Sequence, residues 1–390
     1  MIPYSRQDIT DDDIIEVNKI LQSDFLTQGP TVPKFEQLVS NYCGAKHAVA
    51  VNSATSALHI ACLALDLGPG DLLWTSPNTF VASANCGLYC GADIDFVDID
   101  SKTYNMSVDA LSEKLIKAEK LGKLPKVLIP VHFAGQPCDM LAIYDLSKRY
   151  GFKIIEDASH AIGSSYNKIK VGSCNHSDIT VFSFHPVKII TTAEGGMALT
   201  NNKDIADKMS RLRTHGIATE KILMRKRPKN EIWNYQQIEL GFNYRMNDIQ
   251  AALGINQMKR LDNYIKIRHE IAKIYDIELD TISITKPFQS PTNYSSYHLY
   301  PIRVKENAKG QTQKKVYNIL QKHNIAVNLH YIPVHRHPYY ENLGFKKNDF
   351  PESEKLHREV ISLPIFPKLS SEQQKIVIEH LISAIQNIKN

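Results

Sequence analysis

Lys188 has unusual surroundings for a lysine. It lies in a short loop after the apolar stretch 179–184 and Pro186, with Val187 before it and Ile189 after it. Burial disfavours the ammonium form, so a lysine in apolar surroundings has a lowered pKa and can serve as an amine nucleophile. The alternative is a lysine at a sheet edge whose stem covers apolar neighbours while its amine stays in water. Schiff-base chemistry is therefore the first reaction that the sequence suggests.

Asp157 is an acidic residue that directly follows the apolar strand predicted for 153–156. An acid in this place can lie buried against a cation, and the cation then keeps it ionised. A protonated pyridine nitrogen is one such cation. His160, three residues later, lies on the same side if a turn or helix begins here. The alternative role for Asp157 is to cap the N-terminus of a helix.

Small and hydroxylated residues open the helix that we predict from Ala54 onward, with the sequence Asn-Ser-Ala-Thr-Ser-Ala at 52–57. Free N–H groups at a helix N-terminus, together with the helix dipole, attract phosphate. Simple capping by Ser53 or Thr55 is the alternative. Phe80 adds an aromatic face at another strand end. A phosphate cradle, a buried acid and a reactive lysine are what pyridoxal phosphate requires together.

These residues follow successive strands of a predicted α/β region. Short apolar strands alternate with amphipathic helices from about residue 45 to 200, which indicates a largely parallel sheet with helices on both faces. Ligands of such sheets collect at the carboxyl ends of the strands. The predicted strands are His47–Val51, Asp71–Thr75, Ile94–Val97, Val127–His132, Lys153–Glu156, Ile179–Phe184 and Met197–Thr200.

The pattern changes after residue 246. The segment 240–246 (Leu-Gly-Phe-Asn-Tyr-Arg-Met) precedes one long predicted helix over 247–269, and on its own it could be no more than a helix start capped by Asn247. A second α+β region follows, with strands predicted at 298–304 and 326–330 and a terminal helix at 372–388. We predict an N-terminal segment 1–30 packing on the small domain, a large domain 31–260 and a small domain 261–390.

Composition narrows the class of protein. The 390 residues suit two domains, and 43% hydrophobic with 22% charged residues is ordinary for a soluble enzyme. A net charge of +5 with scattered Lys and Arg does not indicate nucleic-acid binding. The sequence contains neither a signal peptide nor a membrane-spanning stretch, and its six cysteines form no CxxC pair. We therefore expect a cytoplasmic protein with buried free thiols and no metal site.

Four motifs give the chain a definite resemblance. They are Glu-Asp-Ala-Ser-His-Ala-Ile-Gly at 156–163, Phe-Ser-Phe-His-Pro-Val-Lys at 182–188, Ala-Glu-Gly-Gly at 193–196 and Gly-Phe-Asn-Tyr-Arg at 241–245. With them, essentially the whole chain resembles the DegT/DnrJ/EryC1/StrS sugar aminotransferases, which have the type I fold of aspartate aminotransferase. A related branch that dehydrates sugars carries His in place of the lysine, and Lys188 argues against that branch.

The resemblance implies roles for individual residues. Lys188 would be the Schiff-base lysine and proton carrier, Asp157 would pair with the pyridinium nitrogen, and His160 would lie near the ring hydroxyl as the third catalytic group. The other cofactor contacts implied are Ala54, Thr55, Phe80, Ser183 and Asn243, the last from the second subunit of a homodimer with shared active sites. The implied substrate contacts are Tyr4, Asp24, Phe25, Leu26, Thr27, Ala54, Ser183, Asn243, Leu329, His330, Tyr331 and Ile332.

Within the family, the segments 24–30, 52–57, 130–139 and 329–335 are similar to the branch that supplies pseudaminic acid biosynthesis. That branch transfers the amino group of L-glutamate to C4 of UDP-2-acetamido-2,6-dideoxy-β-L-arabino-hexos-4-ulose. Amination of another nucleotide 4-keto sugar is one alternative, and a non-catalytic regulator that binds pyridoxal phosphate is another. A NAD-dependent oxidoreductase would need a GxGxxG fingerprint, which this sequence lacks. The basic loop Lys221–Lys229 is either a solvated loop or an attractor of the UDP diphosphate.

Overall fold

A mixed seven-stranded sheet forms the centre of the chain in the computed structural model, which describes residues 1–389 except 227, 229, 232–233, 307–309 and 311. Strand β9 is antiparallel to both of its neighbours, and the other adjacent strands are parallel. In order across the sheet the strands are β1 (His47–Val51), β9 (Gly196–Thr200), β8 (Ile179–Ser183), β5 (Lys153–Asp157), β4 (Val127–Ile129), β2 (Leu72–Thr75) and β3 (Asp93–Phe96).

All seven strands predicted for this sheet are present. Their runs of apolar residues are buried on both faces, as expected for a sheet covered by helices. Strand β4 ends at Ile129 rather than at the predicted His132, because Pro130 supplies no backbone N–H and the chain then turns into the 3₁₀ helix η1 (Phe133–Gly135).

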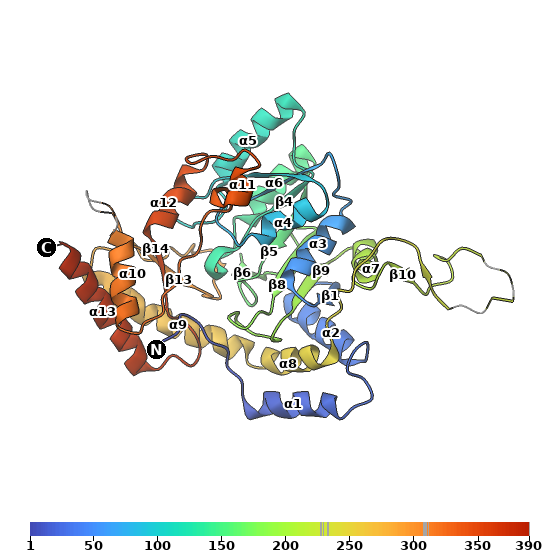
Figure 1. The fold of residues 1–390 in the computed structure, drawn as a ribbon, viewed down its shortest axis with the longest axis horizontal. Coiled ribbons are helices and arrows are strands. Elements are labelled where there is room, and N and C mark those ends of the chain that lie inside the picture. Colours follow the sequence, from blue (N-terminus) through green and yellow to red (C-terminus); the bar gives the residue numbers. More distant parts are fainter. Residues whose placement is uncertain (227, 229, 232–233, 307–309, 311, 390) are drawn as a thin grey trace.

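Helices cover both faces of the sheet (Figure 1). One face packs against α3 (Ala54–Ala64), α4 (Ala82–Tyr89) and α7 (Lys203–Leu212). The opposite face packs against α2 (Thr31–Cys43), α5 (Val108–Leu121), α6 (Met140–Tyr150) and α8 (Asp248–Met258). All six cysteines are buried and unbridged, as the sequence predicted.

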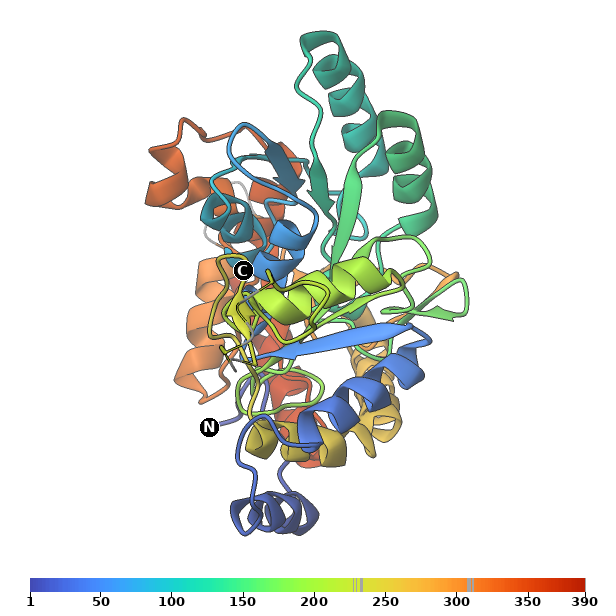
Figure 2. The ribbon, with the colours of Figure 1, turned by 90° about the vertical axis from the view of Figure 1, so that its right-hand side faces the viewer.

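The prediction of a single long helix over 247–269 is wrong. Two helices occupy this region, α8 and α9 (Leu261–Glu278), and the chain turns at Lys259 and Arg260 between them. Arg260 thereby reaches the buried carboxylate of Asp13, which also accepts a hydrogen bond from Asn256. Asp13 belongs to α1 (Asp11–Leu21), which packs along α8 away from the sheet (Figure 2).

The second region has its own apolar core. It contains the antiparallel pair β13 (Tyr300–Arg303) and β14 (Val360–Leu363) with α10 (Thr312–Lys322) and α13 (Ser371–Lys389). The prediction of a strand at 326–330 is wrong, because these residues form a single isolated bridge, between Asn328 and Ser362. The N-terminus touches both regions: Ile2 bridges to Ile325, whereas α1 lies on α8. The division at residues 30 and 260 stays a prediction.

Smaller elements complete the chain. A three-stranded sheet joins β12 (Asn293–Tyr294), β6 (Ser165–Tyr166) and β7 (Ile169–Lys170), and an arm built on β10 (Ile217–Ala218) and β11 (Gln236–Gln237) projects from the body (Figure 1). The remaining short helices are η2 (Leu279–Thr281), η3 (Val334–Arg336), α11 (Pro338–Glu341) and α12 (Pro351–Glu359). Over the described part of the chain, no helix has the length and apolar character needed to cross a bilayer.

Candidate active site

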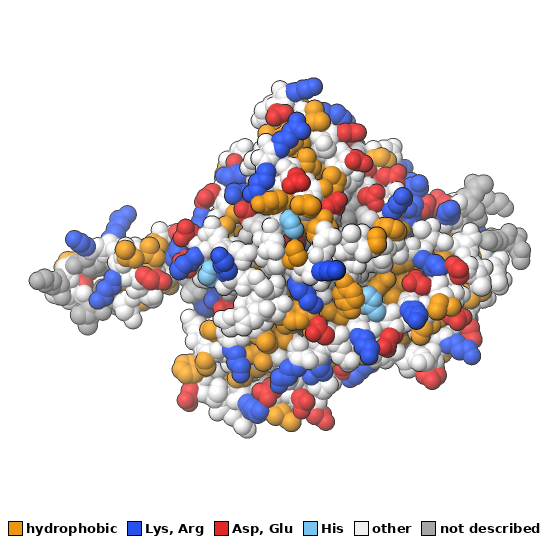
Figure 3. All heavy atoms as spheres, turned by 180° about the vertical axis from the view of Figure 1, so that it is seen from behind, with side chains coloured by type: hydrophobic (Ala, Val, Ile, Leu, Met, Phe, Trp, Pro, Cys, Tyr) orange, Lys and Arg blue, Asp and Glu red, His pale blue; other side chains and the backbone are white. Residues whose placement is uncertain are grey.

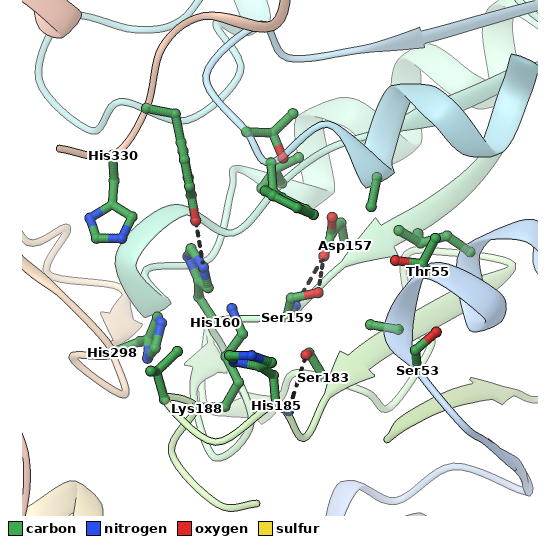
Figure 4. A pocket seen from close by; sticks show the side chains of 18 of the residues that line it. Ser53, Thr55, Asp157, Ser159, His160, Ser183, His185, Lys188, His298 and His330 are labelled. Carbon is green, nitrogen blue, oxygen red and sulfur yellow. Dashed lines mark hydrogen bonds between the residues drawn. The ribbon is translucent and has the colours of Figure 1, made fainter. Parts of the chain in front are cut away.

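A cavity of about 480 Å³ opens at the carboxyl ends of β5 and β8 (Figure 4). The helix N-terminus of α3, the loop after β2, the N-terminal segment and the loop 328–331 complete its wall. Eleven of the residues proposed from the sequence line it: Tyr4, Ala54, Thr55, Phe80, Asp157, His160, Ser183, Lys188, Leu329, His330 and Tyr331.

Lys188 reaches the cavity from the turn that follows β8. Its backbone N–H donates to the carbonyl of His185 at 2.9 Å, which fixes this turn. Burial lowers the pKa of Lys188 to about 8, and the negative charge of Asp157 opposes this shift. Lys188 is only partly exposed and lines the cavity, so its position favours the reactive amine over a lysine whose amine lies in open water at a sheet edge.

We expect the amine of Lys188 to gain reactivity through about pH 8 in protein freed of cofactor. Below that pH the side chain is an ammonium ion, and above it the neutral amine attacks, whereas an ordinary lysine titrates near about 10.4. The measurement is the rate of acylation of the peptide containing Lys188 against pH, followed by mass spectrometry. Lys153, which is half exposed in an ion pair with Asp178, is the internal control. A Lys188 that reacts with the same pH profile as Lys153 would contradict the buried amine.

Asp157 is the last residue of β5 and is 5% exposed. Its Oδ1 accepts hydrogen bonds from the N–H and the hydroxyl of Ser159, and its Oδ2 accepts one from the hydroxyl of Ser83. Turns rather than an α-helix follow Asp157, so the alternative role as a helix cap does not apply. A buried carboxylate that faces a cavity is suited to pair with a cation.

His160 lies between the two regions of the chain. Its Nδ1 accepts the backbone N–H of Ala134, so its Nε2 carries the proton and donates to the hydroxyl of Tyr331 at 3.1 Å. Its ring centroid lies 4.3 Å from that of His298. Burial, and after it the charge of Lys188, lowers the pKa of His160, and the same two causes lower that of His330 to about 3. The imidazoles of His160 and His330 are therefore neutral near pH 7.

The N-terminus of α3 forms the opposite wall. Ser53 caps the helix by accepting the N–H of Ser56 at 3.1 Å, and Ala54 and Thr55 follow at the cavity surface. The first N–H groups of a helix have no partner within the helix, which makes this end a site for phosphate. A Cβ at Gly196 would lie 2.5 Å from the backbone nitrogen of Ala54, so the glycine allows β9 to pass directly beside the cradle. Capping and phosphate binding are thus compatible.

The remaining proposed residues lie outside the cavity of a single chain. Asn243 is exposed and forms a backbone bridge with Thr214. The four residues 24–27 are exposed as well, and Ile332 is 48% exposed.

The cavity also contains residues to which the sequence gave no role. Thr79, His298 and Asn328 are the polar ones that no motif included. His298 is 2% exposed, and its Nδ1 has no hydrogen-bond partner among the described residues. In the sequence, the position of His298 at the start of the apolar strand predicted for 298–304 was the only signal that could have pointed to its role. The other such residues are Leu58 and Ala82, while Ser53, Val131, Ser159, His185, Val187 and Glu194 lie within quoted motifs.

Two further features of the structure are the distribution of charge on its surface and the arrangement of possible metal ligands. Lys and Arg are interspersed with Asp and Glu over the face in Figure 3, rather than gathered into the basic stripe of a nucleic-acid-binding surface. Among the described residues there is no group of three His, Cys, Asp or Glu side chains arranged to hold a metal ion.

The chain is similar in sequence to members of one aminotransferase family. The model of the DegT/DnrJ/EryC1/StrS aminotransferase family matches residues 7–382. The spore coat polysaccharide biosynthesis protein SpsC of Bacillus subtilis is 39% identical over 97% of this chain and 95% of its own. The UDP-4-amino-4,6-dideoxy-N-acetyl-beta-L-altrosamine transaminase of Campylobacter jejuni is 36% identical over 100% of this chain and 99% of its own.

Solved structures show that the chain is similar to aminotransferases in its fold as well as in its sequence. Helicobacter pylori PseC, an aminotransferase involved in the biosynthesis of pseudaminic acid, is 31% identical with a TM-score of 0.88 and covers 99% of both chains. The type I aminotransferase fold predicted from the sequence is thereby confirmed. Structures of similar fold have also been solved in PLP and PMP forms, so the cofactor is pyridoxal phosphate.

Proposed function

Because the chain belongs to the DegT/DnrJ/EryC1/StrS aminotransferase family, it is a sugar aminotransferase that uses pyridoxal phosphate, and we propose its specific reaction. It moves the amino group of L-glutamate to C4 of UDP-2-acetamido-2,6-dideoxy-β-L-arabino-hexos-4-ulose. The product is UDP-4-amino-4,6-dideoxy-N-acetyl-β-L-altrosamine, an intermediate of pseudaminic acid biosynthesis. The similarity to the Campylobacter jejuni transaminase over the full length of both chains is the observation that carries this choice.

The cavity fits pyridoxal phosphate. An amine with a lowered pKa, a buried carboxylate and a helix N-terminus line one space of about 480 Å³. Lys188 would hold the cofactor's aldehyde carbon, Asp157 its ring nitrogen, and Ala54, Thr55 and Ser183 its phosphate. Phe80, 61% exposed at the cavity mouth, would lie on the ring face. When bound, the cofactor supplies an electron sink for the carbon that loses its proton.

The protein's own groups then move the proton. The Nζ of Lys188, neutral above about pH 8, would accept the proton from Cα of glutamate and deliver it to the cofactor carbon that was the aldehyde. In the second half-reaction it would take a proton from that carbon and give it to C4 of the sugar. The carboxylate of Asp157 holds positive charge on the ring nitrogen. His160, with its proton on Nε2, orients the hydroxyl of Tyr331. Tyr4 and His330, whose ring centroids lie 5.6 Å apart, would face the sugar.

A second candidate is amination of a different nucleotide 4-keto sugar. SpsC, which acts in spore coat polysaccharide biosynthesis, is 39% identical to this chain, so full-length similarity of this degree extends beyond one pathway. A regulator without turnover is less well supported, because Lys188 and Asp157 line the same cavity. A glutamate half-reaction assay separates the regulator from both enzymes, since only an enzyme converts glutamate to 2-oxoglutarate.

Substrate choice is tested by a panel of 4-keto nucleotide sugars with glutamate as donor. We expect the L-arabino sugar to have the highest kcat/KM, its D-xylo epimer at C5 to be slower, and the pentose that lacks C6 and the 2-acetamido group to be slowest. A site that hydrogen-bonds particular groups leaves its own polar atoms unpaired with the wrong sugar, at a cost of up to about 10⁴-fold. Faster turnover of the D-xylo epimer would reject the pseudaminic acid assignment but not the aminotransferase.

We also propose a homodimer with shared active sites. Asn243 and residues 24–27 lie outside the cavity of their own chain, and apolar side chains close to them in sequence are exposed: Leu240 by 80% and Phe25 by 53%. Ile222 in the projecting arm is 92% exposed. Exposed apolar surface of this kind is typical of an interface. Asn243 and residues 24–27 would then contact the cofactor and the sugar of the other subunit.

Mixed dimers test the sharing. The variants Lys188→Ala and Asn243→Ala, each severely impaired alone, should recover activity when their subunits are combined, because one of the two hybrid sites is then intact. A mixture of Lys188→Ala with Asp157→Asn is the matched control. Both of these residues line the cavity of one chain, so neither hybrid site is complete. Mixed dimers of the first pair that form and recover nothing would show that Asn243 does not act across the interface.

Two expectations stay predictions. Attraction of the UDP diphosphate by the basic loop rests on Lys221, Arg225 and Lys226 together with Arg227 and Lys229, and the last two lie outside the described residues. A cytoplasmic location is the other.

A further inference from the structure

Three hydrogen bonds hold the carboxylate of Asp157, and two of them are short. The hydroxyl of Ser159 donates to Oδ1 at 2.6 Å, its backbone N–H donates to the same oxygen at 3.1 Å, and the hydroxyl of Ser83 donates to Oδ2 at 2.6 Å. Ser83 belongs to α4 and is fully buried, while Ser159 lies in the turn after β5. The two serines thus hold the carboxylate from different elements.

Hydrogen bonds link the hydroxyl of Thr79 to that of Ser83, and the hydroxyl of Ser83 to the carboxylate of Asp157. Each hydroxyl has one proton, and this determines which group donates in each bond. An ionised carboxylate only accepts hydrogen bonds, so the single proton of the Ser83 hydroxyl is used on Asp157. The hydroxyl of Thr79 lies 2.7 Å from that of Ser83 and must therefore be the donor in this contact. The hydrogen bonds run from Thr79 through Ser83 to Asp157. The carbonyl of Phe80 is a second possible acceptor for the Ser83 hydroxyl, but it lies at 3.4 Å, whereas Oδ2 of Asp157 lies at 2.6 Å.

A count of acceptor sites then indicates what the carboxylate can still bind. A carboxylate offers about four lone-pair sites, two on each oxygen. The Ser159 pair fills both sites on Oδ1, and Ser83 fills one on Oδ2. One site on Oδ2 is left, and Asp157 lines the cavity. This site suits a single N–H donor such as a heteroaromatic cation, and not a bidentate group.

We propose that Ser83 and Ser159 are positioning residues that fix the rotation of the Asp157 carboxylate and direct one acceptor site on Oδ2 toward the ring nitrogen of the cofactor. The proposal rests on the role of Asp157 in the proposed function and deepens it. Without the Ser83 hydroxyl, Ser159 still holds Oδ1, but Oδ2 has two open sites instead of one. The contact with the ring nitrogen then loses its fixed direction.

The test compares two cofactors on the full-length chain freed of cofactor. Pyridoxal phosphate has the ring nitrogen, whereas its 1-deaza analogue has C–H in that place and keeps the aldehyde and the phosphate. The ratio of the two dissociation constants therefore isolates the contact with the ring nitrogen. We expect the wild type to prefer pyridoxal phosphate and Ser83→Ala to reduce that preference by about tenfold, the size of effect typical for a hydrogen bond to a charged group.

Controls separate positioning from general loosening. Ser147→Ala removes a buried helical hydroxyl that donates to the carbonyl of Tyr144, and it should leave the ratio unchanged. Asp157→Asn should reduce the ratio at least as much as Ser83→Ala. If Ser83→Ala does not fold, Ser159→Ala, a change in a turn, carries the same prediction.

The outcomes are distinct. A reduced ratio in Ser83→Ala or Ser159→Ala, with an unchanged ratio in Ser147→Ala, supports the proposal. Equal weakening of both cofactors, or no change, in the two serine variants overturns it while leaving Asp157 in its role, provided that Asp157→Asn lowers the ratio. A wild type with equal affinity for both cofactors overturns the role of Asp157 and the positioning together.

Discussion

Lys188→Ala is expected to reduce amino transfer by about 10⁴-fold or more, because the variant loses both the amine that holds the cofactor and the base that moves the proton. The structure supports both roles: the amine lines the cavity, and burial lowers its pKa to about 8. The measurement is turnover of glutamate and the 4-keto sugar under saturating conditions. The folded state should survive, since the buried carboxylate of Asp157 keeps its hydrogen bonds from Ser83 and Ser159 when the amine is removed.

A matched control is Lys208→Ala. Lys208 is a partly buried lysine on α7 whose ammonium pairs with Asp66, outside the cavity. It should keep wild-type turnover with at most a small loss of stability, as expected for a surface ion pair. Turnover of Lys188→Ala within tenfold of the control would mean that another amine performs the chemistry.

Asp157→Asn is expected to slow the glutamate half-reaction by about 10²- to 10⁴-fold. A neutral amide does not stabilise a positive ring nitrogen, so the bound cofactor becomes a weaker electron sink. The amide preserves the shape of the side chain, and its oxygen still accepts hydrogen bonds from Ser83 or Ser159, so the variant should fold and bind cofactor more weakly. Stopped-flow absorbance after glutamate addition measures the rate.

The control for this substitution is Asp178→Asn. Asp178 precedes β8, where its carboxylate accepts the N–H of Ile154 and pairs with Lys153. It is a structural acid beside β5, the strand that carries Asp157, so its variant should keep the half-reaction rate. A rate for Asp157→Asn close to that of Asp178→Asn would reduce Asp157 to a structural acid as well.

Local sequence patterns sufficed for the central sheet. Each strand is a short apolar run bounded by polar or turn residues, so it can be recognised from the local sequence without knowing which helices bury it. The places where the site residues lie were predictable for the same reason. Lys188 and Asp157 follow strands, and the carboxyl ends of parallel strands lie at one edge of the sheet.

Features that depend on distant contacts were not predictable. The break between α8 and α9 places Arg260 against Asp13, which lies 247 residues away in the sequence. The segment 326–330 has strand-like residues but no continuous partner, since Asn328 forms only an isolated bridge with Ser362. His298 and Thr79 enter the cavity through packing of separate regions, which no local spacing encodes. Asn243 has no role in the cavity of its own chain, so its assignment needs a second copy.

Reduction of the resting protein with borohydride, followed by peptide mapping, tests the central claim most directly. Borohydride fixes pyridoxal phosphate to the amine that holds it. We predict a single labelled peptide that contains Lys188, and no label on that peptide in Lys188→Ala. A label on any other lysine of the wild-type chain would contradict the account of this active site.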